Sequence, residues 1–186
     1  MINIYTATEN AYAESELKEN LKKILKGDVP IVVCIGTDAV TGDSLGPLVG
    51  SLLKKKAGGL TYVFGSMENP VTATDVASLK KMIKGVYPYS RILAVDAALG
   101  SKAEVGSVKL SDGPIKPGLG VNKDLGEIGD ASIIGVVDEK KKANASLYSV
   151  RLSRVYFQAE LISSAVARYL EETVGDGKKR NFSFSD

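Results

Sequence analysis

The chain has 186 residues, of which 44% are hydrophobic, and its 24 basic and 22 acidic side chains leave a formal charge of +2. This length and composition fit one α/β domain spanning residues 1–186, and the near-neutral balance predicts no general attraction to nucleic acid or to a membrane surface. Histidine is absent, which excludes Ser-His and Cys-His catalytic pairs and imidazole metal ligands. Acid–base chemistry must then come from carboxylates, Lys or Tyr.

The single cysteine and the hydropathy pattern bear on where the protein works. One cysteine cannot form an intramolecular disulfide, and Cys34 lies in the apolar run IVVCIG, so we interpret it as a core residue rather than a nucleophile. The N-terminal residues lack a charged region followed by an apolar stretch, and no window approaches the roughly 20 apolar residues that span a bilayer. We expect a cytoplasmic protein without a signal peptide or a membrane partner.

The first half of the chain alternates helical and strand patterns. Residues 15–26 predict an amphipathic helix with Ser15 as its N-cap, and residues 30–36 predict a strand buried on both faces. The remaining elements are a helix within 43–59 that Asp43 or Thr41 caps, a short strand at 60–65, a surface helix within 72–85 and an apolar strand at 90–100. This alternation favours a parallel, doubly wound sheet with right-handed crossovers.

The second half is less regular. Residues 105–113 alternate like a half-exposed strand, 113–129 are rich in Gly and Pro and predict a long functional loop, and 132–138 again predict a buried strand. Residues 139–153 are polar and irregular, a long helix is expected at about 153–173, and residues from about 175 to 186 are expected to form a loose tail.

Two aspartates stand where such a sheet places ligands. In the stretch VVCIGTDAVTGDSLGPLVGSLL, residues 32–53, Asp43 follows the first buried strand, and Asp96 stands at the end of the later apolar strand. Ligands of open parallel sheets bind at the carboxyl ends of strands, where the strand order reverses. If the first core strand is central, both carboxyl groups lie in one crevice.

A close pair of carboxyl groups has a distinct chemistry. Two such groups cannot both ionise easily, so one pKa rises and the pair can share a proton. Asp43, at a helix start, is expected to ionise more readily, and Asp96, at the end of an apolar strand, is expected to hold the proton. One member can then activate water while the other protonates a carbonyl or a leaving group.

Simpler interpretations stay open for each residue. Asp43 alone could cap a helix, and Asp96 alone could belong to an ordinary turn, so the pair is more informative than either member. The glycine-rich turn lacks the spacing of a dinucleotide or phosphate loop. The KKK clusters at 54–56 and 140–142 are typical of solvated surface.

Three blocks of the sequence carry a family resemblance. IGTDAVTGDSLGPLVG resembles the signature of the YyaC family of sporulation proteins, a family of unknown function (DUF1256), and is similar to the TPDALGP stretch of spore germination proteases. The segments GSMENPVTATDVASLKKMIKGVYPYSRILAVDAALG and GSVKLSDGPIKPGLGVNKDLGEIGDASIIGVVD continue the likeness in order. The similarity to the proteases covers roughly residues 30–140, and that to the first family covers nearly the whole chain.

The resemblance implies a fold and an activity. The fold is that of germination proteases and hydrogenase-maturation proteases, a three-layer α/β sandwich around a mostly parallel sheet. The germination proteases are atypical aspartic endopeptidases that degrade small acid-soluble spore proteins, and their two catalytic aspartates match Asp43 and Asp96. The hydrogenase-maturation proteases hold nickel with carboxylates at these two positions and a histidine, and the lack of histidine argues against nickel here.

The sequence also departs from the protease pattern. The proline before the first catalytic aspartate is replaced by glycine, giving TGD, and the protease stretch GVPTVVD is shortened to GVVD. The chain is much shorter than the germination proteases and shows no obvious prosegment. Only the aspartate pair and the glycines around it carry over, and substrate recognition does not.

These observations lead to one main hypothesis and two alternatives. The main one is a peptide-bond hydrolase of the forespore or spore core that uses Asp43 and Asp96 and needs no cofactor or metal. Its substrate-binding residues are expected to be Thr37, Asp38, Ser44, Gly118 and Asn122. Its partners are protein or peptide substrates such as small acid-soluble spore proteins, without direct nucleic-acid contact, and a homo-oligomer through the final helix stays open.

The alternatives differ in what the two aspartates do. The first is a catalytically inactive sporulation protein that kept the fold and binds a spore protein or peptide. The second is a Mg²⁺ or Ca²⁺ site made of Asp38, Asp43 and Asp96, whose oxygens are the ligands such ions prefer.

Overall fold

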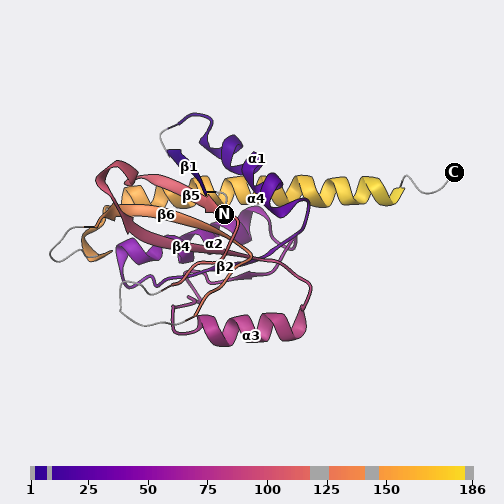
Figure 1. The fold of residues 1–186 in the computed structure, drawn as a ribbon, viewed down its shortest axis with the longest axis horizontal. Coiled ribbons are helices and arrows are strands. Elements are labelled where there is room, and N and C mark those ends of the chain that lie inside the picture. Colours follow the sequence, from indigo (N-terminus) through magenta and orange to yellow (C-terminus); the bar gives the residue numbers. More distant parts are fainter. Residues whose placement is uncertain (1–2, 8–9, 118–125, 141–146, 183–186) are drawn as a thin grey trace.

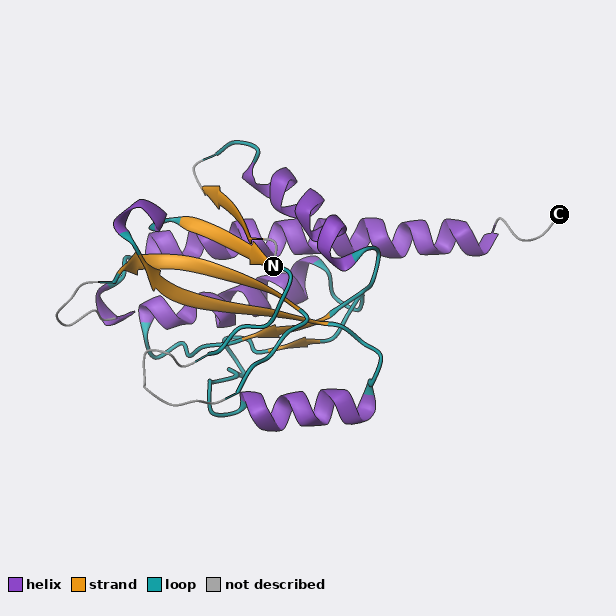
Figure 2. Cartoon of the chain, in the orientation of Figure 1, coloured by secondary structure: helices purple, strands orange, loops and turns teal. Residues whose placement is uncertain are grey.

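The fold is a six-stranded sheet between two layers of helices (Figure 1, Figure 2). The structure is a computed structural model that describes residues 3–7, 10–117, 126–140 and 147–182. The strands are β1 (Asn3–Ala7), β2 (Ile31–Cys34), β3 (Val63–Phe64), β4 (Ile92–Gly100), β5 (Ser107–Ser111) and β6 (Ala131–Glu139). The helices are α1 (Ala13–Leu25), α2 (Leu45–Lys56), α3 (Val76–Val86) and α4 (Leu152–Phe182), with short 3-10 turns η1 (Thr41–Ser44), η2 (Lys102–Glu104) and η4 (Leu147–Ser149).

The sheet has the order β1-β5-β6-β4-β2-β3. Strands β6, β4, β2 and β3 are parallel, whereas β5 runs antiparallel to β6 and β1 antiparallel to β5. The predicted three-layer α/β sandwich around a mostly parallel sheet is therefore confirmed. Strand β1 was not predicted, because its sequence NIYTA is short and has no continuous apolar run.

The strand order reverses at β2. The chain leaves β2 through α2 to reach β3 on one side, and returns through α3 to β4 on the other side. Because right-handed crossovers in opposite directions lie on opposite faces, α2 and α3 cover different sides of the sheet. The segments that follow β2 and β4 thus leave in different directions, and a crevice forms between the carboxyl ends of these two strands.

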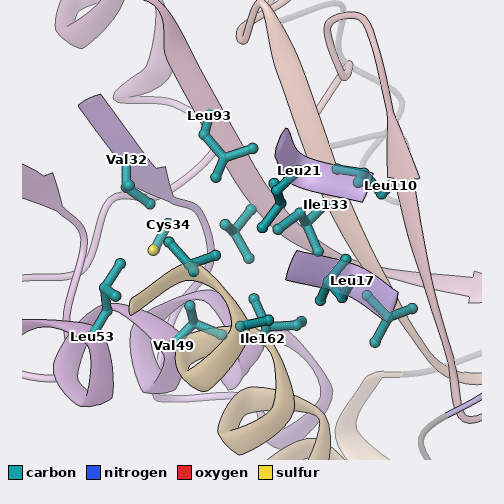
Figure 3. Packing of buried hydrophobic residues seen from close by; sticks show 14 of the residues in the cluster. Leu17, Leu21, Val32, Cys34, Val49, Leu53, Leu93, Leu110, Ile133 and Ile162 are labelled. Atoms are coloured by element: carbon teal, nitrogen blue, oxygen red, sulfur yellow. The ribbon is translucent and has the colours of Figure 1, made fainter. Parts of the chain in front are cut away.

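The two faces of β2 and β4 have separate hydrophobic clusters. Val32 and Cys34 point toward α1, α2 and α4, together with residues such as Leu21, Val49 and Ile162 (Figure 3). Ile31 and Val33 point the other way and pack with α3. Burial on both faces explains the continuous apolar runs in the sequence, and the prediction that Cys34 is a core residue is confirmed. Burial raises the pKa of the Cys34 thiol to about 12, which keeps it protonated and unreactive.

Two helix boundaries differ from the predicted ones. Helix α1 begins at Ala13 with Tyr12 in the capping position, so Ser15 lies within the helix and is not its cap. Helix α4 continues to Phe182, beyond the predicted end near 173, and its last turns extend past the body of the molecule (Figure 1). Within the described residues, no helix is both long and apolar enough to cross a membrane.

Candidate active site

Asp43 follows β2 and Asp96 lies within β4, the two strands that border the crevice. Asp43 is part of the turn η1. The prediction that Asp96 stands at a strand end is wrong, because β4 continues to Gly100 while paired with β6. Its neighbour β2, however, ends at Cys34 opposite Val95. Asp96 is therefore the first β4 residue beyond the last β2 pair, and the β2 side of its strand is open there.

The turn after β2 holds the Asp43 side chain in place. The Thr37 N–H donates to Asp43 Oδ2 at 3.1 Å and to the Asp43 carbonyl oxygen at 3.2 Å. Gly36 has a φ of +139°, and a Cβ at this residue would lie 2.0 Å from the Asp43 carbonyl oxygen. Only glycine lets the backbone close the turn in this way.

The capping interpretation of Asp43 is not supported. The residue before α2 is Ser44, and no side chain caps this helix. The Asp43 carboxylate instead accepts a hydrogen bond from Thr37, across the turn. Thr41, the other predicted cap, is the first residue of η1.

The two carboxyl groups interact electrostatically. Burial raises the pKa of Asp96 to about 8, a hydrogen bond from the Ala97 N–H opposes the shift, and the negative charge of Asp43 adds to it. Burial also raises the pKa of Asp43, and the hydrogen bond from Thr37 opposes that shift. The η1 turn that carries Asp43 packs against β4, and with its pKa raised to about 8 Asp96 holds a proton near neutral pH.

The other predicted site residues are distributed around η1. Thr37 is half-buried, and its Oγ1 accepts a hydrogen bond from the Ala39 N–H at 3.2 Å. Asp38 is exposed. Ser44 is buried, and its Oγ donates to the Thr41 carbonyl oxygen at 2.7 Å. Gly118 and Asn122 lie outside the described residues.

The ends of the predicted functional loop are fixed. Ile115 and Ile128 exchange backbone hydrogen bonds of 2.9 and 3.0 Å and form an isolated antiparallel bridge. Both side chains belong to the cluster under α3. The loop is thus anchored on the α3 face of the sheet, and residues 118–125 between these ends are outside the described part of the chain.

Sequence reasoning missed one contact that supports Asp43. A Cβ at Gly42 would lie 2.7 Å from the Leu147 carbonyl oxygen and 2.8 Å from Val150 Cγ2. The residue before Asp43 must therefore be glycine because the η4 segment packs directly against it. No local sequence signal reports this contact, since the partners are more than 100 residues apart.

Two cavities lie at opposite ends of the strands. One, of about 660 Å³, is lined by Asp38, Thr41 and Ser44 of the turn around Asp43 and by residues of α2 and α4. The other, of about 370 Å³, is lined by residues 28–29 and 87–91 near the amino ends of β2 and β4. Of these two, the cavity of about 660 Å³ is the one that adjoins the turn carrying Asp43.

The three-carboxylate metal site is not formed. Across the described ranges, no group of three or more His, Cys, Asp or Glu side chains could hold a metal ion. Asp38 thus does not join Asp43 and Asp96. Nickel does not fit either, because the chain lacks the histidine that the resemblance requires beside the two carboxyl groups.

Comparisons with known proteins place the chain in a family. The YyaC protein of Bacillus subtilis (strain 168), described as uncharacterized, is 42% identical over 137 residues, which cover 72% of this chain and 67% of YyaC. Inosine-5′-monophosphate dehydrogenase of the same organism is 25% identical over 158 residues, 84% of this chain but only 29% of the dehydrogenase. The [NiFe] hydrogenase maturation protease HycI from Thermococcus kodakarensis KOD1 matches with a TM-score of 0.43 and 19% identity, over 79% of this chain and 98% of HycI. The family model described as a protein of unknown function, DUF1256, matches residues 2–165, and the chain therefore belongs to the DUF1256 family, as its motifs predict.

Proposed function

We propose that the protein is a peptide-bond hydrolase in which Asp43 and Asp96 share the acid–base work. The observation that carries this proposal is the pair itself, with two carboxyl groups at the topological switch point and unequal proton affinities. The half-buried Asp96 is desolvated by the surrounding protein and feels the charge of Asp43, so its pKa rises to about 8 and it holds a proton near neutral pH. Pairs of titratable groups with separated pKa values are typical of acid–base catalysis.

The division of labour follows from the hydrogen bonds. Asp43 is the base, since the Thr37 N–H stabilises its charged form at Oδ2, and its Oδ1 takes a proton from water as the water oxygen attacks the peptide carbonyl carbon. Protonated Asp96 is the acid and donates its proton to the carbonyl oxygen, which gives a neutral tetrahedral diol.

Breakdown of the diol restores both groups. Asp43 passes the proton it took from water to the peptide nitrogen, and the C–N bond breaks. Asp96 regains its proton from the diol hydroxyl as the carboxylic acid product forms. The products are one carboxylic acid and one amine, and the two aspartates return to their starting states.

The substrate class follows from the family resemblance. Small acid-soluble spore proteins are the substrates of the germination proteases whose catalytic aspartates match this pair. We extend the proposal to these proteins and to the forespore or spore core as the place of action. Neither extension is needed for the hydrolytic mechanism.

The test compares purified wild type with Asp43→Asn and Asp96→Asn in incubations with small acid-soluble spore proteins, read by mass spectrometry of the fragments. Loss of one acid–base group is expected to slow cleavage by about 10²–10⁴-fold. Asp112→Asn is the matched control, because Asp112 is an exposed aspartate that follows β5 and lies outside the site.

Two results would overturn the mechanism. Cleavage that survives both substitutions would eliminate the aspartate pair as the catalytic groups. Binding of the spore proteins without cleavage by any form would instead favour the inactive binding protein with the same fold.

A further inference from the structure

The cavity beside Asp43 is an apolar groove. Its apolar wall comes from α2, the segment after β3 and the first turns of α4, and consists of Leu48, Met67, Leu152, Tyr156 and Phe157. Its volume of about 660 Å³ is within the range of roughly 300–1,000 Å³ that is usual for ligand clefts. The groove is thus large enough for a substrate side chain.

The apolar wall is unusually open to water. Leu152 is 61% exposed, Phe157 65%, Tyr156 44% and Met67 38%. The rings of Tyr156 and Phe157 meet edge to face at 5.9 Å, which gives the wall a defined shape. Neighbouring exposed apolar side chains around one hollow are typical of a binding site, since their burial by a ligand is favourable.

The groove and the aspartate pair share one turn. Thr41 and Ser44 line the groove, and Asp43 lies between them on η1. The hydrogen bond from Ser44 Oγ to the Thr41 carbonyl oxygen closes this turn, and Gly42 is packed against η4. A side chain bound in the groove is therefore held at a fixed place relative to the Asp43 carboxylate.

We propose that this groove binds a large apolar side chain, such as Leu, Met or Phe, of the protein substrate, next to the bond that is cleaved. The proposal rests on the proposed function and names the substrate feature that the site selects. Asp38 and Ser153 also line the groove and are exposed, so they can accept hydrogen bonds from the peptide backbone. The occupant is a peptide segment because Thr41 and Ser44, which line the groove, flank Asp43, the proposed base in peptide hydrolysis.

The test measures binding separately from cleavage. Short labelled Gly-Ser peptides with one central Phe, Leu, Ala or Asp are titrated by fluorescence anisotropy against Asp96→Asn protein, in which cleavage is expected to be too slow to deplete the peptide during the measurement. The Phe and Leu peptides are expected to bind about 10-fold or more tightly than the Ala peptide. Leu152→Ser and Phe157→Ser, each added to Asp96→Asn, are expected to bring these affinities within about 3-fold of each other.

A matched control keeps the result specific. Tyr12→Ser removes another exposed apolar side chain, at the start of α1 and outside the groove, and should leave the preference for Phe and Leu intact. Analytical ultracentrifugation of each variant measures its oligomeric state and so tests whether a second copy of the chain occupies the groove instead.

Each outcome decides one question. Equal affinities for the Phe and Ala peptides, or no binding of either, would overturn the subsite. A dimer that Phe157→Ser dissociates, without peptide discrimination, would overturn it in favour of self-association. Preferential binding of apolar peptides without cleavage by wild type would support the subsite and overturn the proposed hydrolysis. Cleavage without a preference for apolar peptides would support the hydrolysis and overturn the subsite.

Discussion

At the scale of single residues, the aspartate pair is held in an electrostatically unfavourable state. Asp96 lies among apolar β4 residues and near a second carboxylate, and both conditions raise its pKa. Groups held in this way reduce stability, and such costs are found where activity requires them. That Asp96 holds the proton of the pair stays a prediction, and the raised pKa of Asp96 agrees with it.

Replacement of Asp96 by Asn should stabilise the protein at neutral pH. Folding raises the pKa of Asp96 from its ordinary value to about 8, so between these pH values the folded chain binds more protons than the unfolded chain. Stability therefore falls as pH rises through this window. Asn carries no charge and can still accept the Ala97 hydrogen bond, and the expected gain at pH 8 is about 1–3 kcal/mol.

Urea unfolding of wild type and Asp96→Asn at acidic, neutral and alkaline pH measures this effect. The difference between the two proteins should be small at pH 4 and should grow up to about pH 8. Asp112→Asn should follow wild type. A variant less stable than wild type at pH 8 would contradict the raised pKa.

The rate of peptide hydrolysis should have a falling limb near pH 8. Asp96 must be protonated to act as the acid, so activity is lost as pH passes its pKa of about 8. On the acidic side activity should rise as Asp43 ionises, above the ordinary carboxyl range because burial raises its pKa. A profile of kcat/KM against pH measures both limbs, and activity that keeps rising beyond pH 9 would rule out Asp96 as the acid.

At the scale of elements, the sequence predicts what local patterns encode and misses what distant contacts decide. The apolar runs of β2 and β4 are visible because both faces are buried. Strand β1 carries no such run, and pairing with β5 decides its conformation. The continuation of β4 to Gly100 depends on pairing with β6, which no pattern within residues 96–100 reports.

The same distinction explains the two differences in the site. Asp43 resembles a helix cap in sequence, yet the turn directs its carboxylate to Thr37, which lies six residues earlier. Gly42 resembles an ordinary turn glycine, yet the distant η4 segment leaves no room for a side chain. In both cases tertiary contacts override the local preference.

The packing of η4 on η1 predicts the effect of Gly42→Ala. The added methyl group would meet the Leu147 carbonyl oxygen at 2.7 Å, so the turn must shift and Asp43 must move with it. We expect a loss of about 1–3 kcal/mol of stability and at least 10-fold in activity.

The matched control for that variant is Gly85→Ala. Gly85 lies in α3, where a Cβ meets nothing within 4 Å. Alanine should add about 0.5–1 kcal/mol of stability there and leave activity unchanged. Thermal unfolding and peptide hydrolysis measure both variants, and full activity of Gly42→Ala would show that η4 does not position Asp43.

At the scale of the whole molecule, α4 joins the proposed substrate groove to the core. Its first turns carry Leu152 and Phe157 at the groove, and its middle turns pack Ile162 and Tyr169 into the main cluster. Farther along, Glu172 forms ion pairs with Lys18 and Lys22 of α1. One rigid helix thus fixes the groove relative to the sheet that carries Asp96.

This arrangement predicts that substitutions in the middle of α4 change stability, whereas substitutions in its first turns change substrate preference. Tyr169 is fully buried, and its hydroxyl donates to the Asp28 carbonyl oxygen at 2.6 Å. Tyr169→Phe removes this hydrogen bond and should cost about 1 kcal/mol of stability without a change in substrate preference.

Phe157→Ser should have the opposite profile, because its side chain is 65% exposed and contributes little to the core. Its free energy of unfolding should stay within about 0.5 kcal/mol of the wild-type value. The preference for apolar side chains, measured as a ratio of kcat/KM values, should fall about 10-fold. Urea unfolding and hydrolysis of paired Phe and Ala peptides measure the two effects on the same preparations. If Phe157→Ser loses stability and keeps its preference, the exposed end of α4 belongs to the core of the fold and not to the substrate site.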